Sequence, residues 1–267
     1  MIRKLKKTLG GIRYTIFSKK EKFDCNVING KSIKSTKGCV RIEKDMDDVW
    51  FNKLAQNSEK IFDIGCNVGY TSLVALTNDN VKKILMVDPN PEALTLANKN
   101  VICNNYIHKT NSFLGFVSNQ NAAELEFYTI GYGAAGSMYK SHAETAAAIG
   151  SSYKVQTTTI DFLTDYFQWI PDFIKIDVEG AEFFVLDGAR KTLTTNSIKI
   201  LVEMHSSKEL SMFDNATKVL NWCDEVGYEA WYLKTNEKLF SPEIIKNRGR
   251  CHLLLLPAKY NYPEYLK

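Results

Sequence analysis

The central part of the chain alternates short, strongly apolar runs with longer amphipathic segments. The runs are apolar at nearly every position, which is typical of strands buried on both faces of a sheet. The segments between them carry apolar residues three or four positions apart, which favours helices. This alternation predicts a doubly wound α/β domain with a mostly parallel sheet. The runs lie at 61–65, 83–88, 171–178 and 198–204, and the helical segments at 70–77, 91–103, 181–193 and 213–226.

The flanking segments show other patterns. The stretch up to Gly38 is irregular, and a helix is expected at about 47–56. Two strands on either side of the polar stretch SNQNAA, at 113–118 and 124–130, predict a hairpin. A closing pair of strands is expected to add an antiparallel edge to the sheet. The remaining expected strands lie at 155–160, 228–234 and 251–257.

The first 22 residues are strongly basic. They hold eight basic side chains and one acidic, a net charge of +7, so the remaining residues carry −3 of the overall +4. Apolar residues recur there every three or four positions, the pattern of an amphipathic helix on an anionic membrane, although Gly10 and Gly11 interrupt it. A solvated or packed extension without a partner is the alternative. We therefore expect a basic N-terminal extension with a leading helix (1–58) and a main domain (59–267).

Composition narrows the setting of the protein. Because residues 23–267 carry net negative charge, we expect no nucleic-acid partner. The six cysteines are scattered without C-x-x-C spacing, so they are expected to be reduced packing residues. The sequence shows no export signal and no apolar run near the roughly 18 residues that span a membrane. A soluble, cytoplasmic protein is expected, with residues 1–22 as a candidate contact with the inner membrane surface.

The turn after the first apolar run carries an acid and two glycines, as Asp63-x-Gly65-x-x-x-Gly69. Ligands of doubly wound sheets bind at this turn. The dinucleotide fingerprint has three glycines around a pyrophosphate, which a carboxylate would repel. The ammonium and sulfonium groups of S-adenosylmethionine suit a carboxylate, and the backbone amides at 67–71 can receive its carboxylate.

Asp88 ends the second apolar run, 23 residues after Gly65. At this distance an acid meets the ribose hydroxyls of nucleosides in doubly wound folds. NAD would need the same acid, so Asp88 supports an adenosine ligand without choosing between cofactors. Each feature alone could be only a turn or a helix cap, but together at this spacing they favour a cofactor site.

The stretch PDFIKIDVEGAEFFVLDGARKTL (171–193), followed by ILVEMH (200–205), resembles the FkbM type of class I S-adenosylmethionine-dependent methyltransferase. The resemblance runs from about residue 60 to 205. It implies a Rossmann-like sheet of seven strands and methyl transfer, commonly to a hydroxyl of a sugar, glycan or secondary metabolite. It also implies which residues contact the cofactor. Those on the methionine side are Asp63, Gly65, Asn67, Gly69, Tyr70 and Thr71. Asp88 and Pro89 would contact the ribose, Phe116 within 115–117 the adenine, and Ser137 would contact the cofactor from a loop, 133–138, that closes over it.

Candidate catalytic residues lie at the carboxyl ends of the third and fourth apolar runs. An alcohol acceptor must lose its proton, and His205 is the natural base because its ordinary pKa is about 6.5. Asp177 and Glu179 can hold acceptor hydroxyls, bind a cation or raise one another's pKa. A structural role in capping or an ion pair is the alternative for these two acids, and a buried, hydrogen-bonded role for His205. Lys175 and Glu203 are candidate substrate contacts, although Lys175 could instead be a sheet-end residue that reaches solvent.

The sequence thus predicts an S-adenosylmethionine-dependent O-methyltransferase that acts on a small-molecule or glycan acceptor. N-methylation of another small molecule, protein or nucleic acid is an alternative, although the Pro-Pro motif of base aminomethylases is missing after the fourth run. A non-catalytic adenosyl-ligand-binding protein and an NAD-dependent oxidoreductase are further alternatives. We assign no metal, since no diagnostic ligand spacing is found.

Overall fold

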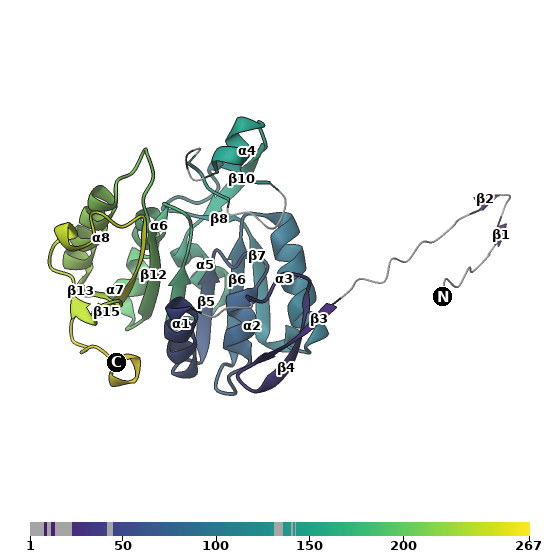
Figure 1. The fold of residues 1–267 in the computed structure, drawn as a ribbon, viewed down its shortest axis with the longest axis horizontal. Coiled ribbons are helices and arrows are strands. Elements are labelled where there is room, and N and C mark those ends of the chain that lie inside the picture. Colours follow the sequence, from purple (N-terminus) through teal and green to yellow (C-terminus); the bar gives the residue numbers. More distant parts are fainter. Residues whose placement is uncertain are drawn as a thin grey trace.

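The computed structural model describes residues 8–9, 12–13, 23–41, 45–130, 136–139, 141 and 143–267. Its largest sheet has eight strands (Figure 1). The strands from β12 through β11, β5 and β6 to β7 all run parallel, which confirms the predicted mostly parallel sheet. In spatial order the strands are β14 (Glu237–Lys238), β13 (Tyr228–Tyr232), β15 (Arg250–Pro257), β12 (Lys199–His205), β11 (Phe173–Ile176), β5 (Lys60–Ile64), β6 (Lys83–Asp88) and β7 (Thr110–Leu114).

The closing strands differ from the expectation in one respect. β15 runs antiparallel to both of its neighbours, β12 and β13, so the antiparallel strand lies inside the sheet and not at its edge. A long crossover through α8 (Met212–Val226) connects β12 to β13, and β15 fills the place between them. The two-residue β14 extends the expected seven strands to eight.

Helices cover both faces of the sheet (Figure 1). Successive strand residues point to opposite faces, so Ile61 packs with the first three helices and Phe62 with the later ones. This arrangement buries nearly every side chain of β5, β6, β11, β12 and β15, which is why these runs are continuously apolar. One face carries α1 (Met46–Gln56), α2 (Tyr70–Leu76) and α3 (Pro91–Cys103), and the other α5 (Ile160–Phe167), α6 (Glu182–Asp187), α7 (Arg190–Thr195) and α8. Shorter helices are α4 (Glu144–Ala148), η1 (Ile107–Lys109), η2 (Pro242–Ile244) and η3 (Glu264–Leu266).

The stretch expected to be irregular contains a hairpin, β3 (Phe23–Ile28) and β4 (Lys31–Thr36). Its turn is Asn29-Gly30, and both residues have positive φ, 49° and 76°. Asn-Gly between two strands is a strong hairpin signal, so the sequence contained this information. Ile28 and Ile33 share a core cluster with α1 and β5. The buried side chains of this hairpin and of α1, both assigned above to an extension, therefore belong to the same core as β5.

Only four residues of the basic leader are described. Thr8–Leu9 and Ile12–Arg13 form a short antiparallel pair, β1 and β2, in place of the helix expected there. Glycine is a poor helix former, and Gly10 and Gly11 separate the two strands in the sequence. The rest of residues 1–22, and with it the expected membrane contact, lies outside the described residues. None of the described helices is long and apolar enough to cross a bilayer.

The predicted hairpin of 113–118 and 124–130 is wrong. β8 (Phe116–Val117) and β9 (Glu124–Tyr128) both pair with β10 (Ser152–Thr158), which lies between them. The polar stretch between β8 and β9 is a true turn signal, but a turn signal does not exclude insertion of a later strand. The resulting three-stranded sheet lies beside the carboxyl end of the main sheet (Figure 1).

The expected helix at 181–193 is divided into α6 and α7. Gly188, at the division, packs against the neighbouring backbone so closely that a Cβ there would lie 2.1 Å from the carbonyl oxygen of Ser118. The Asp161 carboxylate accepts hydrogen bonds from the backbone N–H groups of Lys191 and Thr192 at the start of α7. Asp161 therefore stabilises the start of a separate second helix.

Candidate active site

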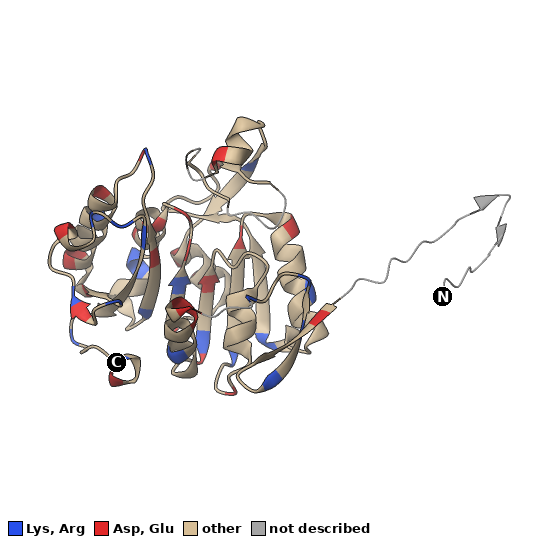
Figure 2. Cartoon of the chain, viewed as in Figure 1, with Lys and Arg blue, Asp and Glu red and all other residues tan. Residues whose placement is uncertain are grey.

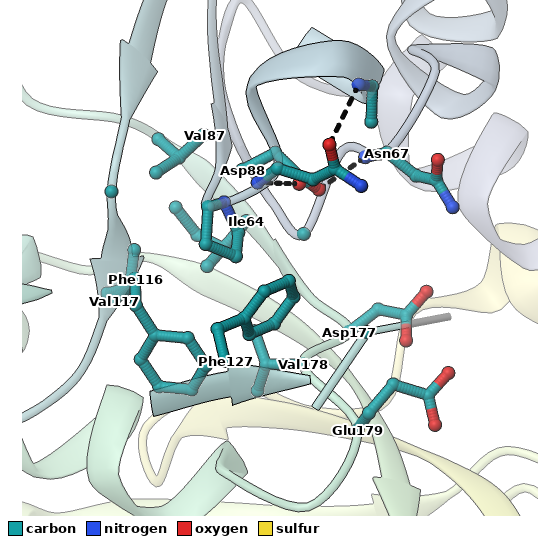
Figure 3. Close-up of a pocket in the computed structure, with 16 residues that line it drawn as sticks. Ile64, Asn67, Val87, Asp88, Phe116, Val117, Phe127, Asp177, Val178 and Glu179 are labelled. Carbon is teal, nitrogen blue, oxygen red and sulfur yellow. Dashed lines mark hydrogen bonds between the residues drawn. The ribbon is translucent and has the colours of Figure 1, made fainter. Parts of the chain in front are cut away.

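A cavity lies beyond the carboxyl ends of β5, β6 and β11, where doubly wound sheets bind ligands (Figure 3). Two further cavities adjoin it. The second cavity lies between the end of β4 and the turn that connects β5 to α2. The third lies between α1 and the carboxyl ends of β11 and β12. Asp177 lines all three. The carboxylate of this residue is therefore located at the junction of the three cavities.

Asp88 lines the first cavity, as the sequence predicted. Its two carboxylate oxygens accept backbone N–H bonds from Asn90 and Asn67, each at 2.8 Å (Figure 3). These bonds fix the carboxylate, and each oxygen keeps a second lone pair for a ligand hydroxyl. Burial raises the pKa of Asp88 to about 6, although the two backbone bonds act in the opposite direction. Pro89 lines the same cavity.

The wall opposite Asp88 is apolar. Phe116 and Phe127 lie side by side there with ring centroids 6.1 Å apart (Figure 3). Phe116 was expected near the adenine, whereas Phe127 was missed because β9 reaches the site only through its pairing with β10. Gly136 also lines the cavity, and a Cβ there would lie 2.2 Å from the Phe127 ring. The slot between a carboxylate and two aromatic rings has the chemistry of a nucleoside site.

The two glycines of the turn between β5 and α2 have different structural roles. Gly65 has φ +74°, and a Cβ there would lie 1.8 Å from the carbonyl oxygen of Asp177. It therefore brings the first turn against the end of β11, and it lines the first two cavities. Gly69, with φ +82°, packs against α3, where a Cβ would lie 2.9 Å from the Ala97 Cβ. Its expected contact with the ligand is replaced by helix packing.

Asp63 lies behind the cavity and not on its surface. It is fully buried, and one oxygen accepts hydrogen bonds from the hydroxyls of Thr71 and Ser72 at 2.7 and 2.6 Å. The other oxygen is 3.5 Å from the Lys175 ammonium. We therefore correct the expectation that Asp63 meets the ligand directly. The Asp63 carboxylate instead interacts within the protein, where its hydrogen bonds with Thr71 and Ser72 link the start of α2 to β5.

Lys175 is buried, at 7% exposure, and it lines the second and third cavities. Its ammonium donates to the carbonyl oxygen of Gly65 at 2.9 Å and lies 3.2 Å from the Asp177 carboxylate. Burial by itself lowers the pKa of Lys175, but attraction to Asp177 and Asp63 outweighs this, so the pKa lies above its ordinary value. The lysine remains charged and holds Asp177 in place from beneath, rather than extending into solvent.

Tyr70 and Thr71 line the second cavity, together with Asn67. The backbone amides of 67–71 were expected to receive an anion, but two of them are used internally. Asn67 donates to Asp88, and Gly69 donates to the carbonyl oxygen of Cys66 at 2.8 Å. Burial and the nearby Asp48 carboxylate raise the pKa of Tyr70, so its hydroxyl stays protonated. The hairpin end contributes Thr36 to Cys39 and Arg41 to this cavity, and sequence reasoning missed all of them.

Ser137 holds a loop and does not face the ligand space. Its hydroxyl donates to the carbonyl oxygen of Glu179 at 2.8 Å and accepts from the Tyr139 N–H at 3.0 Å. It is almost fully buried, at 1% exposure. The expected cofactor contact is therefore replaced by support of the segment that carries Glu179.

Asp177 and Glu179 follow β11, which ends at Ile176. Their carboxylates point in the same direction, away from Phe116 and Phe127 (Figure 3). Glu179 has φ +51°, which is unusual for a residue with a side chain. The pair faces the same space because of this irregular turn and not because of strand alternation. The two carboxylates are placed where an acceptor hydroxyl could approach the ligand in the first cavity.

His205 is buried among carboxylates. Its Nδ1 lies 2.9 Å from Glu182, and its Nε2 lies 3.5 Å from Glu179 and 3.6 Å from Glu203. Burial alone would lower the pKa of His205, but hydrogen bonds and charge attraction from Glu182 and Glu203 raise it to about 11. A raised pKa keeps the ring protonated at neutral pH, which does not favour His205 as the base. The assignment of His205 as the base stays a prediction, and its three carboxylate neighbours favour a supporting role instead.

Glu203 lines the third cavity and is contacted by several basic side chains. Arg250 contacts one of its oxygens at 3.1 Å and His252 contacts the other at 3.3 Å. Burial raises the pKa of Glu203, but hydrogen bonds from His205 and His252 outweigh it and hold the pKa below its usual range. His252 also lies 3.1 Å from Asp47 of α1. No spacing in the sequence links His252 to this site, because β15 enters the sheet from the far end of the chain.

Among the described residues, one group of three could hold a metal ion. Asp177, Glu203 and His205 each offer one atom, and these atoms lie within 4.8 Å of one another. In this structure Lys175 is paired with Asp177, and Arg250 with Glu203. The protein's own cations thus already neutralise much of this charge.

Comparison with known proteins gives a family for most of this region. The family model described as Methyltransferase FkbM domain matches residues 63–230. None of the curated proteins matches the chain. Among solved structures, the chain is similar to a methyltransferase FkbM from Methylobacillus flagellatus KT (18% identity, 74% of this chain and 44% of that one, TM-score 0.47). It is also similar to M. jannaschii TYW2 in complex with AdoMet (13%, 91% and 88%, 0.47) and to M. capricolum TrmK in complex with S-adenosyl-homocysteine (14%, 84% and 72%, 0.47).

Proposed function

The chain belongs to the FkbM methyltransferase family, and we propose that it is an O-methyltransferase acting on a hydroxyl of a sugar, glycan or related small molecule. Its methyl donor is S-adenosyl-L-methionine. The residues present fit this cofactor. The first cavity combines an anchored carboxylate, Asp88, with the aromatic slot of Phe116 and Phe127, which suits a ribose and an adenine.

We assign the cofactor to the first cavity and the adjoining part of the second. Asp88 would accept the ribose hydroxyls, and Phe116, Phe127 and Val117 would enclose the adenine. Asn67, Tyr70 and Thr71 line the second cavity and would hold the methionine end. When bound, the cofactor supplies a methyl group already activated by a positively charged sulfur.

The observation that carries the proposal is the position of Asp177. It lines the first, second and third cavities, so it lies where the cofactor meets the space that remains for an acceptor in the third cavity and the rest of the second. Since the methyl group is already activated, this chain's task is to align an acceptor hydroxyl and remove its proton. Asp177 can accept that proton, with Glu179 beside it to hold a further hydroxyl. Lys175 keeps the Asp177 carboxylate oriented from beneath.

The charges of the described residues favour a small acceptor over a nucleic acid. Lysine and arginine are interspersed with acidic residues along the ribbon of the described part of the chain (Figure 2). The cleft itself is rich in carboxylates, since Asp47, Asp177, Glu179 and Glu203 all line its cavities. A polyhydroxylated acceptor can donate hydrogen bonds to such groups.

Cofactor affinity should depend on pH through Asp88. Because its pKa is about 6, the carboxylate is ionised above that pH and accepts ribose hydroxyls best there. Affinity for S-adenosylhomocysteine is therefore expected to fall as the pH drops below about 6, by at most about tenfold per pH unit for one proton. Calorimetric titration from about pH 5 to 8 measures this. Asp88→Asn should bind more weakly and lack the dependence, and a flat profile for the unmodified protein would contradict the assignment.

The test of the function is methyl transfer itself. The protein is incubated with isotopically labelled S-adenosylmethionine and a panel of nucleotide sugars, oligosaccharides and lipid-linked glycans, and products are read by mass spectrometry. We expect one panel class to gain a labelled methyl group on oxygen. Transfer to nitrogen, or binding of S-adenosylhomocysteine with no transfer to a broad acceptor panel, would contradict the proposal.

A further inference from the structure

Glu182 is a fully buried acid at the start of α6, close to the cleft but behind its surface. One of its oxygens accepts from the Gly180 N–H at 2.9 Å and lies 2.9 Å from His205 Nδ1. The other accepts from the Asn215 amide at 3.0 Å. A buried carboxylate is costly unless it is hydrogen-bonded and paired with a cation, and this one meets both conditions.

These contacts fix the orientation of the His205 ring. Glu182 accepts only, so the facing Nδ1 of His205 must carry a hydrogen. The Asn215 amide also donates to the His205 carbonyl oxygen at 2.9 Å, which ties the side chain and the backbone to the same partners. With Nδ1 directed at Glu182, Nε2 must face the opposite side.

On that side Nε2 meets carboxylates from two different cavities. Glu179 lines the cofactor cavity and Glu203 lines the third cavity, and they lie 3.5 and 3.6 Å from the same nitrogen. Two carboxylates this close repel each other unless a positive group lies between them. His205 lies between them, and a bare Nε2 lone pair would be repelled by both carboxylates, so this geometry fits an Nε2–H that donates toward the two acids rather than a group that acts on the acceptor.

We propose that Glu182 is a positioning residue of the methyl-transfer site, which orients His205 so that Nε2 holds Glu179 and Glu203 at the acceptor side of the cleft. This inference rests on the function proposed above. It assigns His205 and Glu182 to the support of the acids and leaves proton removal to Asp177. The strained backbone at Glu179 is consistent with a side chain whose position is imposed by its surroundings.

The test compares Glu182→Gln with the unmodified protein. Glutamine keeps the size of the side chain but replaces one acceptor by a donor, which then faces the Asn215 amide donor. We expect kcat to fall by about 10- to 100-fold, as for a small displacement of a reacting group, with KM for S-adenosylmethionine changed by less than about twofold. Asp187→Asn is the matched control, because this acid lies on the same helix and pairs with Arg190 instead.

Two readouts separate positioning from a merely structural role. In a double-mutant cycle with His205→Asn, the kcat effect of Glu182→Gln should disappear, and additive losses would overturn the proposal. In protein labelled with 15N-histidine, both ring nitrogens of His205 should carry protons at about pH 8, well above the ordinary pKa of histidine, in the unmodified protein but not in Glu182→Gln. This measurement needs no acceptor, so it remains informative if the proposed function fails.

A further experiment tests whether a metal ion, rather than His205, holds these acids. The histidine spectrum and kcat are recorded with EDTA and with added Mg²⁺ or Mn²⁺. Unchanged results support the proposal. If a divalent ion is required and Nε2 loses its proton on adding it, a metal and not the imidazole holds the acids, and the proposal is wrong. If Glu182→Gln does not fold, Asn215→Ala removes one donor from Glu182 and should still lower kcat, while calorimetry with S-adenosylhomocysteine confirms an intact cofactor site.

Discussion

Replacing Asp177 by asparagine is expected to lower kcat by about 100- to 10,000-fold, the range that general-base groups contribute. Asparagine keeps the shape of the side chain but cannot take a proton from an acceptor hydroxyl. Binding of S-adenosylhomocysteine should change little, because Asp88 and the aromatic slot remain. Steady-state kinetics with the acceptor found by the panel, together with calorimetry for the product cofactor, give both quantities.

The interpretation of Asp177→Asn depends on its neighbours. Lys175 loses one partner but keeps Asp63 and the Gly65 carbonyl oxygen, so the lysine stays in place. Glu179→Gln serves as the comparison, since Glu179 lies beside Asp177 and is expected to cost less. If Asp177→Asn retains kcat while Glu179→Gln loses it, Glu179 is the base and our assignment is wrong.

Replacing Gly65 by alanine is expected to destabilise the fold and abolish cofactor binding together. The left-handed backbone costs about 1–2 kcal/mol for any residue with a Cβ. The new Cβ would also lie 1.8 Å from the Asp177 carbonyl oxygen, and forcing such a contact apart adds about 1–3 kcal/mol. Because Gly65 lines two cavities and touches the Asp177 backbone, the displacement would reach the cofactor site.

Gly227 offers a matched control for this prediction. It ends α8 with the same φ, +74°, but a Cβ there would meet nothing within 4 Å. Gly227→Ala should therefore cost only the backbone term, about 1–2 kcal/mol, and leave binding of S-adenosylhomocysteine intact. Urea unfolding of both variants measures the difference in the free energy of unfolding. Equal losses for the two variants would show that the close approach at Gly65 has no energetic weight.

Much of the site could be predicted because its parts follow strands. Asp88, Pro89 and Gly65 lie at strand ends, and the carboxyl ends of parallel strands meet at one edge of a sheet. The aromatic slot was only half predictable. Phe116 follows the third strand of the parallel sheet, but Phe127 reaches the cavity because β10 inserts between β8 and β9. Nothing local in the sequence encodes that insertion.

The role of each site residue was harder to predict from the sequence than its position in the fold. Asp63, Ser137 and Lys175 all lie near the site, but their polar atoms are used by partners within the protein. Whether a polar side chain faces a ligand or a neighbour depends on what the fold brings behind it. Residue type and spacing carry no information on that.

By itself, the sequence determined the doubly wound fold and the family, because buried strands and amphipathic helices produce periodic patterns of apolar residues and the family motif is a local stretch of sequence. The tertiary structure decided which acids surround His205 and which basic groups surround Glu203. These surroundings depend on Glu182 from α6 and on Arg250 and His252 from β15, which lie far from their partners in the sequence. Electrostatic energy depends on distance in space and on burial, and neither can be read from the order of residues.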